Sequence, residues 1–222
     1  KLIVRGERFY EAEILEGALN TFREAMAYIS AAYYPASLVF YPMESNLGYR
    51  PGVSKEVFAC LEDEQVNVYR DLCNQLVMPE VAREQPDVIG ISIGTQMQFL
   101  AGLTFAKMIK DTFPQIHVVV GGNVITRLHE DLVNHERFFV EVFDSAILYE
   151  GEHALLWLIE ALNGQRLLAT VPNLIYRDES GLHRNTEVYT EKTATLPLPD
   201  FEGLPLDRYF VQELVIHYLE TG

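Results

Sequence analysis

The chain has 222 residues, of which 49% are apolar and 22% charged, and this composition fits one globular domain or one domain with a small extension. Its 32 Asp and Glu residues outnumber 17 Lys and Arg residues, and the net charge of -15 disfavours nucleic acid and anionic membranes as partners. Two cysteines cannot form a disulfide framework, and the sequence shows neither a signal peptide nor an apolar run of about 20 residues. We therefore expect a soluble, cytoplasmic protein.

The first elements in chain order are a helix and a short strand. Apolar side chains recur at helical spacing from Leu19 to Tyr33, and Pro35 ends that pattern. The following residues, 37–41, predict a strand. Residues 46–74 fit no standard strand–helix unit, and the sequence predicts no role for them.

The middle of the chain alternates strands with helices. The run Asp-Val-Ile-Gly-Ile-Ser-Ile at 87–93 predicts a strand that is buried on both faces of a parallel sheet. A helical stripe from Phe99 to Phe113 follows and ends at Pro114. The alternation continues to the Asn163-Gly164 pair, with strands expected over 116–120 and 143–148 and helices over 126–137 and 155–162.

This βαβαβα order predicts a doubly wound, open and mostly parallel sheet, because right-handed crossovers place helices on both faces. We expect an α/β domain of the Rossmann or flavodoxin-like kind over residues 1–165. Residues 174–184 predict a β-hairpin within an extension that spans 166–198. Residues 199–222 are expected to be a linker to a further domain, opened by a proline-stiffened connector.

Ligands of such sheets bind outside the carboxyl ends of the strands, where the loops 42–52, 92–97, 121–126 and 149–152 should converge. Ser92, Gly94 and Thr95 stand where one strand gives way to a helix, and they offer hydroxyls and backbone N–H groups. Helix capping explains a hydroxyl, whereas a glycine allows the backbone to approach a ligand closely. Both interpretations stay open.

Two further groups of small or acidic residues lie at expected strand ends. Gly121 and Gly122 suit a tight turn or a flat ligand, but they belong to neither a Gly-x-Gly-x-x-Gly fingerprint nor a phosphate-binding loop. Glu150 and Glu152 either complement the dipole of the next helix or accept hydrogen bonds from a ligand. The candidate cofactor-binding residues are Ser92, Gly94, Thr95, Gln96, Gly121, Gly122, Asn123, Glu150, Gly151 and Glu152.

No residues are assigned to a catalytic or metal site. The six histidines lack metal-ligand spacing, and His129 with His135 suits a solvated face. Cys60 and Cys73 are too far apart for Cys-x-x-Cys chemistry. A nucleophile elbow of the Ser-His-Asp type is also missing.

Five segments occur in an order and spacing that can be compared with known families. They are Val-Ile-Gly-Ile-Ser at 88–92, Val-Val-Val-Gly-Gly at 118–122, Asp-Ser-Ala-Ile-Leu-Tyr-Glu-Gly-Glu at 144–152, Pro-Asn-Leu-Ile-Tyr-Arg at 172–177, and Leu-Pro-Leu-Pro-Asp-Phe at 196–201 with Tyr209. Together they resemble the amino-terminal cobalamin-binding region of radical S-adenosylmethionine enzymes. In that family the connector leads into a partial barrel with a Cys-x3-Cys-x2-Cys motif. The resemblance implies that this chain stops immediately before that catalytic domain.

The resemblance also implies roles for the candidate residues. Ser92 and Thr95 would line the pocket for cobalamin's nucleotide tail, Gly121 and Gly122 would flank the tail, and residues 150–152 would close the pocket. Tyr149 stands where the family usually has a glycine, and the Asp-x-His-x-x-Gly motif that supplies a lower axial ligand elsewhere is missing. We therefore expect base-off cobalamin without a protein histidine ligand, and a 4Fe-4S cluster and S-adenosylmethionine in the missing domain.

The predicted function is that of the cobalamin-binding module of a radical S-adenosylmethionine methyltransferase or a peptide or natural-product maturase, inactive when alone. Its partners would be a small-molecule corrinoid and the missing barrel. Two alternatives stay open: a substrate-recognition or scaffold domain that has lost cobalamin, and a flavodoxin-like flavin or nucleotide domain, which rests on fold analogy. We also expect a side chain at Gly122 to block corrinoid binding with far less effect on folding.

Overall fold

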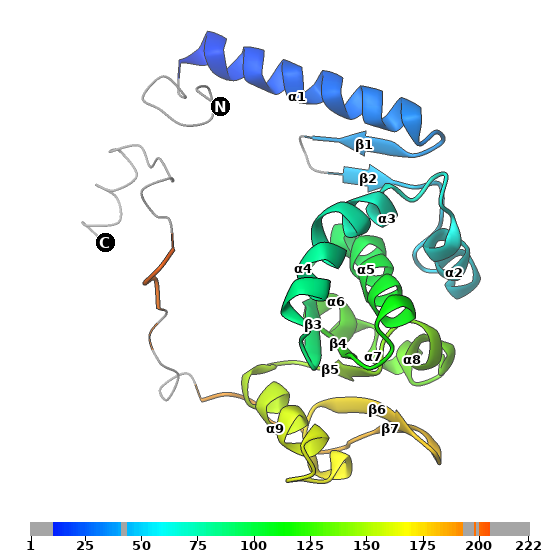
Figure 1. Ribbon diagram of the computed structural model, residues 1–222, viewed down its shortest axis with the longest axis vertical. Coiled ribbons are helices and arrows are strands. Elements are labelled where there is room, and N and C mark those ends of the chain that lie inside the picture. The colour runs from blue at the N-terminus through cyan, green and yellow to red at the C-terminus, as the bar shows by residue number, and fades with distance from the viewer. Residues whose placement is uncertain (1–10, 41–43, 193–197, 199, 205–222) are drawn as a thin grey trace.

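The fold was obtained as a computed structural model, which describes residues 11–40, 44–192, 198 and 200–204. It is an α/β fold with helices on both faces of one sheet and a separate N-terminal helix and hairpin (Figure 1). Residues 196, 197 and 199 of the expected connector and residues 205–222 of the expected linker lie outside the described residues. Within the described ranges, no helix has the length and apolar character needed to cross a membrane.

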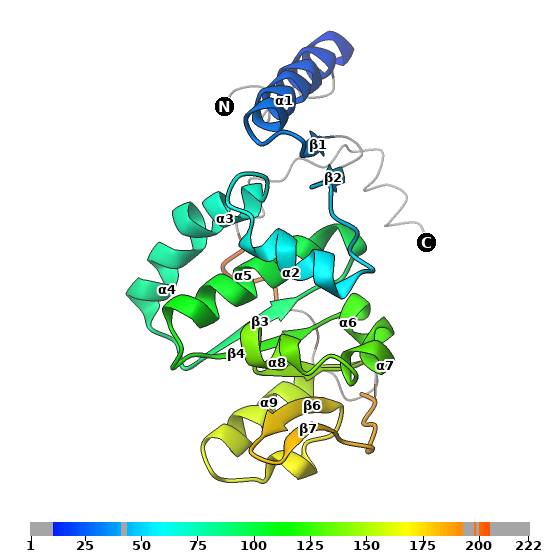
Figure 2. The ribbon, with the colours of Figure 1, turned by 90° about the vertical axis from the view of Figure 1, so that its right-hand side faces the viewer.

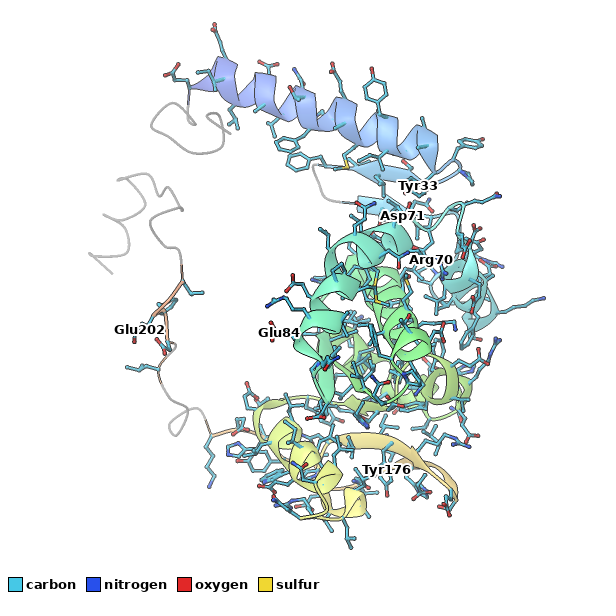
Figure 3. All side chains as sticks on the ribbon, viewed as in Figure 1. Tyr33, Arg70, Asp71, Glu84, Tyr176 and Glu202 are labelled. Atoms are coloured by element: carbon cyan, nitrogen blue, oxygen red, sulfur yellow. The ribbon has the colours of Figure 1, made fainter. Side chains whose placement is uncertain are left out.

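The N-terminal helix α1 (Ala12–Ala32) forms over the predicted segment, but none of its side chains is buried. At its carboxyl end the Tyr33 hydroxyl donates a hydrogen bond to Asp71, and both residues are labelled in Figure 3. The predicted strand at 37–41 is observed as β1 (Ser37–Val39), which pairs antiparallel with β2 (Glu44–Asn46) and does not join the main sheet.

The segment without a predicted role is largely helical and packs beside the main sheet. Its buried Asn67 donates hydrogen bonds from Nδ2 to the Cys60 carbonyl oxygen and to Thr104 Oγ1, each at 2.9 Å. The bond to Thr104 connects the segment to the helix that follows the first strand of the main sheet. Its helices are α2 (Ser54–Glu62) and α3 (Val68–Leu72), and a π-helical turn (Cys73–Val77) and α4 (Met78–Glu84) continue the chain beyond it to the main sheet.

The main sheet has five strands in the order β3-β4-β5-β6-β7. The first three strands run parallel, and the predicted hairpin adds two antiparallel strands directly beside β5. The sheet is therefore mixed, where we expected it to be mostly parallel. Its strands are β3 (Val88–Ser92), β4 (His117–Gly121), β5 (Ser145–Ile147), β6 (Leu174–Asp178) and β7 (Gly181–Arg184).

Alternate residues of the parallel strands face two separate cores. Val118 and Val120 pack in the larger core with α5 and α8, whereas Val119 and Ile147 pack in a second core with α9. In Figure 2, α2, α5 and α8 lie on the near side of β3 and β4. The helix predicted over 126–137 is split into three short helices. The helices after the first parallel strand are α5 (Phe99–Thr112), α6 (Asn123–Arg127), α7 (His129–Leu132), α8 (Arg137–Glu141) and α9 (Glu152–Leu162), with 3₁₀ turns at Gln96–Gln98 and Leu168–Thr170.

Strand β3 is not buried on both faces, which corrects the expectation: Gly90 and Ser92 are exposed. It is also an edge strand, because among the described residues no strand pairs with its outer side. The upstream strand that could have paired there is held in the separate β1–β2 hairpin. On the α9 face, part of the sheet next to β3 is therefore left uncovered.

Candidate functional site

A groove of about 440 Å³ lies on this uncovered part, at the carboxyl ends of β3, β4 and β5. The parallel register places Ser92 beside Gly121 and Gly90 beside Val119, so small residues form the floor near the strand ends. Leu155 of α9 contributes an apolar wall. The lining residues are Gly90, Ile91, Ser92, Val119, Val120, Gly121, Gly122, Ile147, Tyr149, Gly151, Glu152 and Leu155.

Two glycines shape this groove for different physical reasons. A Cβ atom at Gly90 would meet only Val119 Cγ1, at 3.9 Å, so Gly90 leaves space that a side chain would fill. A Cβ atom at Gly122 would lie 2.7 Å from the Ile93 carbonyl oxygen, and the backbone there has a φ of +97°. Gly122 is therefore required by the turn itself, and the expected weak effect of its substitution on folding does not agree with the structure.

Among the residues that the structure describes, the charge lining the groove is limited to one carboxylate. Glu152, the first residue of α9, is the only ionisable acid or base in this described lining apart from the Tyr149 phenol. No described Lys or Arg side chain lines the groove. Such a surface favours a ligand with apolar faces and hydrogen-bond donors over one with a multiply charged phosphate group.

Five of the ten candidate residues line the groove, and five do not. The backbone N–H groups of Gly94 and Thr95 both donate to Gln98 Oε1, at 2.9 and 3.1 Å, so the capping interpretation accounts for them. Asn123 is the first residue of the short helix α6. The five that line the groove are Ser92, Gly121, Gly122, Gly151 and Glu152.

Gln96 instead lines a second pocket of about 470 Å³, which we call the loop pocket. Residues 45–51 form one side of the loop pocket, and Gln96, Met97 and Leu100 form the other. The loop expected over 42–52 thus meets the carboxyl end of β3, as predicted, but the structure assigns it to this separate pocket. Residues 41–43 lie outside the described residues.

Glu150 belongs to a hydrogen-bond network beside the groove. Its carboxylate accepts the backbone N–H of Glu191. The Glu191 carboxylate, whose side chain is only 3% exposed, accepts from the backbone N–H of His153 at 3.2 Å and contacts His153 Nδ1 at 2.5 Å. Asn173 Nδ2 donates to the carbonyl oxygens of Glu150 at 3.3 Å and Tyr189 at 2.8 Å. This network holds the loop between β5 and α9 in place.

The network predicts a pH-dependent contribution to stability. Burial alone would raise the pKa of Glu191, but hydrogen bonds from His153 outweigh it and hold that pKa below its ordinary value. Because the pKa of Glu191 is lower in the folded chain than in the unfolded chain, its carboxylate stabilises the fold at pH values above the ordinary carboxyl range. This stabilisation is lost as the pH falls through the folded-state pKa. We expect Glu191→Gln to be less stable than the wild type at about pH 7, with a smaller difference at about pH 4. Urea unfolding at the two pH values measures this, and an equal difference at both would contradict it.

Residues outside the candidate set also build the site. Gly90 and Tyr149 both line the groove. The sequence does carry a signal for Gly90, because a glycine inside a strand of β-branched residues often marks the close approach of a ligand or of another backbone. His129 lies beside Tyr149, with ring centroids 6.3 Å apart, and its Nδ1 is 2.7 Å from the Thr126 carbonyl oxygen. Within the described ranges, no group of three or more His, Cys, Asp or Glu residues could hold a metal ion.

Comparisons with known proteins gave structural neighbours only. No family model and no curated protein matches the chain. The cobalamin-dependent S-adenosylmethionine radical enzyme OxsB, solved with aqua-cobalamin and S-adenosylmethionine, is 24% identical over 54% of this chain and 16% of its own, with a TM-score of 0.44. The radical S-adenosylmethionine methyltransferase TsrM from Kitasatospora setae, solved with cobalamin and a [4Fe-4S] cluster, is 19% identical over 59% of this chain and 23% of its own, with a TM-score of 0.40.

These neighbours are cobalamin-dependent radical S-adenosylmethionine enzymes, the class that the sequence segments resemble. The chain matches 16% and 23% of the neighbours' lengths.

Proposed function

We propose that this chain is a cobalamin-binding module and that the groove takes the nucleotide tail of the cofactor. The observation that carries the proposal is an apolar groove at the carboxyl ends of three parallel strands, with Gly90 and Gly121 in its floor. Its volume of about 440 Å³ is typical of small-molecule sites. The groove has room for a nucleoside-sized group, and the rest of a corrinoid would lie outside it.

The chemistry of the lining residues supports cobalamin over a flavin or a nucleotide. The tail of cobalamin carries a flat, largely apolar base and a single phosphodiester charge, and its corrin ring carries amide side chains. Glu152 can accept hydrogen bonds from amides. A flavin mononucleotide or a nucleoside diphosphate would bring a phosphate of higher charge, for which the described lining of the groove offers no Lys or Arg.

The proposed state is base-off and without a protein histidine ligand. A base that lies in the groove cannot also coordinate cobalt, and none of the described residues that line the groove is a histidine. His129 is the histidine to test as a ligand, because its ring centroid lies 6.3 Å from that of Tyr149, which lines the groove.

In the whole protein, we place the module beside a radical S-adenosylmethionine domain that acts as a methyltransferase or maturase in the cytoplasm. This part rests on the resemblance of the sequence segments. The two cysteines, Cys60 and Cys73, are buried, and burial raises their pKa values to about 12 and about 11. They cannot supply three thiolate ligands to a cluster, so the iron–sulfur cluster and S-adenosylmethionine belong to the other domain.

An absorbance titration of the purified chain tests the binding proposal. Hydroxocobalamin should give a saturable spectral change, and cobinamide, which lacks the nucleotide tail, should bind at least about tenfold more weakly. Flavin mononucleotide should not bind. Binding of the flavin alone would favour the flavodoxin-like alternative, and binding of none of the three would favour a scaffold or recognition domain.

A further inference from the structure

We infer that Tyr149 contributes to ligand binding at the groove by placing its ring against a flat face of the bound ligand. This inference rests on the proposed function and assigns a role to a residue outside the candidate set. Tyr149 lines the groove and has the largest side chain of the lining residues. It is also 42% exposed, so its ring is accessible to a ligand.

The backbone of Tyr149 has a conformation that a glycine would adopt more easily. Its φ is +59°, in the left-handed region that aromatic residues rarely occupy. A hydrogen bond of 2.7 Å from its backbone N–H to Thr126 Oγ1 ties this residue to the neighbouring loop. The Glu150 network fixes the chain directly after it. The turn at Tyr149 therefore carries a large side chain, although its backbone conformation would be adopted more easily by a glycine.

The Tyr149 ring packs little against the protein interior. It is partly exposed, and within the described part of the chain its hydroxyl has no hydrogen-bond partner. Its ring neighbour is His129, at 6.3 Å between centroids and a tilt of 55°. The nearby groove floor at Gly121 and Gly122 carries no side chains. A planar group over these glycines would therefore find the Tyr149 ring as its aromatic contact, and aromatic rings pack favourably on such groups.

Two variants separate this role from a purely structural one. Tyr149→Phe should bind hydroxocobalamin within about twofold of the wild type, because the ring remains. Tyr149→Gly should weaken binding by about fivefold to a hundredfold, the range expected from the loss of one stacking contact. Without ligand, the melting temperature of Tyr149→Gly should not fall, because glycine adopts the left-handed conformation without strain.

The opposite pattern would overturn the inference: a lower melting temperature for Tyr149→Gly together with unchanged hydroxocobalamin affinity. A wild-type chain that does not bind hydroxocobalamin at all would overturn the proposed function and this inference together. A wild-type chain that binds, with an equal affinity in Tyr149→Gly, would overturn the inference alone.

Discussion

Gly122→Ala should destabilise the chain by about 2 kcal/mol or more, because two costs add at this position. A φ of +97° is strained for any residue with a side chain, and the added Cβ would lie within 2.9 Å of three backbone atoms of Ile93. The Ile93 backbone cannot easily move away, since its N–H donates to the Gly121 carbonyl oxygen at 2.8 Å and its carbonyl oxygen accepts from Val124 at 3.1 Å. Urea unfolding followed by circular dichroism measures the loss.

Gly52→Ala is the matched control for this prediction. A Cβ at Gly52 would have no heavy atom within 4 Å, and the φ of Gly52 is not positive. The free energy of unfolding of Gly52→Ala should therefore differ from that of the wild type by less than about 0.5 kcal/mol. If Gly122→Ala were as stable as Gly52→Ala, the close approach of this turn to the end of β3 would not exist in solution.

Gly90→Leu should weaken hydroxocobalamin binding by at least about tenfold while leaving the fold intact. The added Cβ meets Val119 Cγ1 at 3.9 Å, an ordinary contact, and the rest of the side chain extends into the groove. Stability should stay equal or rise, because glycine is a poor strand residue. Titration with hydroxocobalamin and thermal unfolding measure the two effects on the same sample.

Gly17→Leu provides the corresponding control, since Gly17 lies on the exposed part of α1 with no heavy atom within 4 Å of its added Cβ. Its affinity for hydroxocobalamin should equal that of the wild type. Equal affinity in Gly90→Leu as well would locate the ligand elsewhere, and the loop pocket of about 470 Å³ would be the next site to test.

The elements of the central sheet were predictable because their signals are local. The stripe from Phe99 to Ile109 gave a helix with a buried apolar face, and the run before Gly121 gave a buried strand. The partner of a strand is not a local property. Residues 37–41 and 87–93 both predict strands, but nothing in either segment indicates that the first pairs with residues 44–46 and leaves β3 at the edge.

The candidate site was predictable at the level of loops and less so at the level of side chains. Glu150 and Glu152 look equivalent in the sequence, yet Glu150 bonds to the backbone of Glu191, 41 residues further along, while Glu152 lines the groove. The tyrosine itself carries no signal for the left-handed backbone at Tyr149, and the one indication is the resemblance, in which a glycine usually stands at this position.

Electron paramagnetic resonance of the chain with cob(II)alamin tests the central claim most directly. In free cob(II)alamin the nitrogen of the tail's own base splits the cobalt lines. We predict that this splitting disappears when the wild-type chain is saturated, because the base leaves cobalt for the groove and no histidine replaces it. A spectrum identical to that of free cob(II)alamin, or a nitrogen splitting in the complex that is lost only in His129→Ala, would contradict the account.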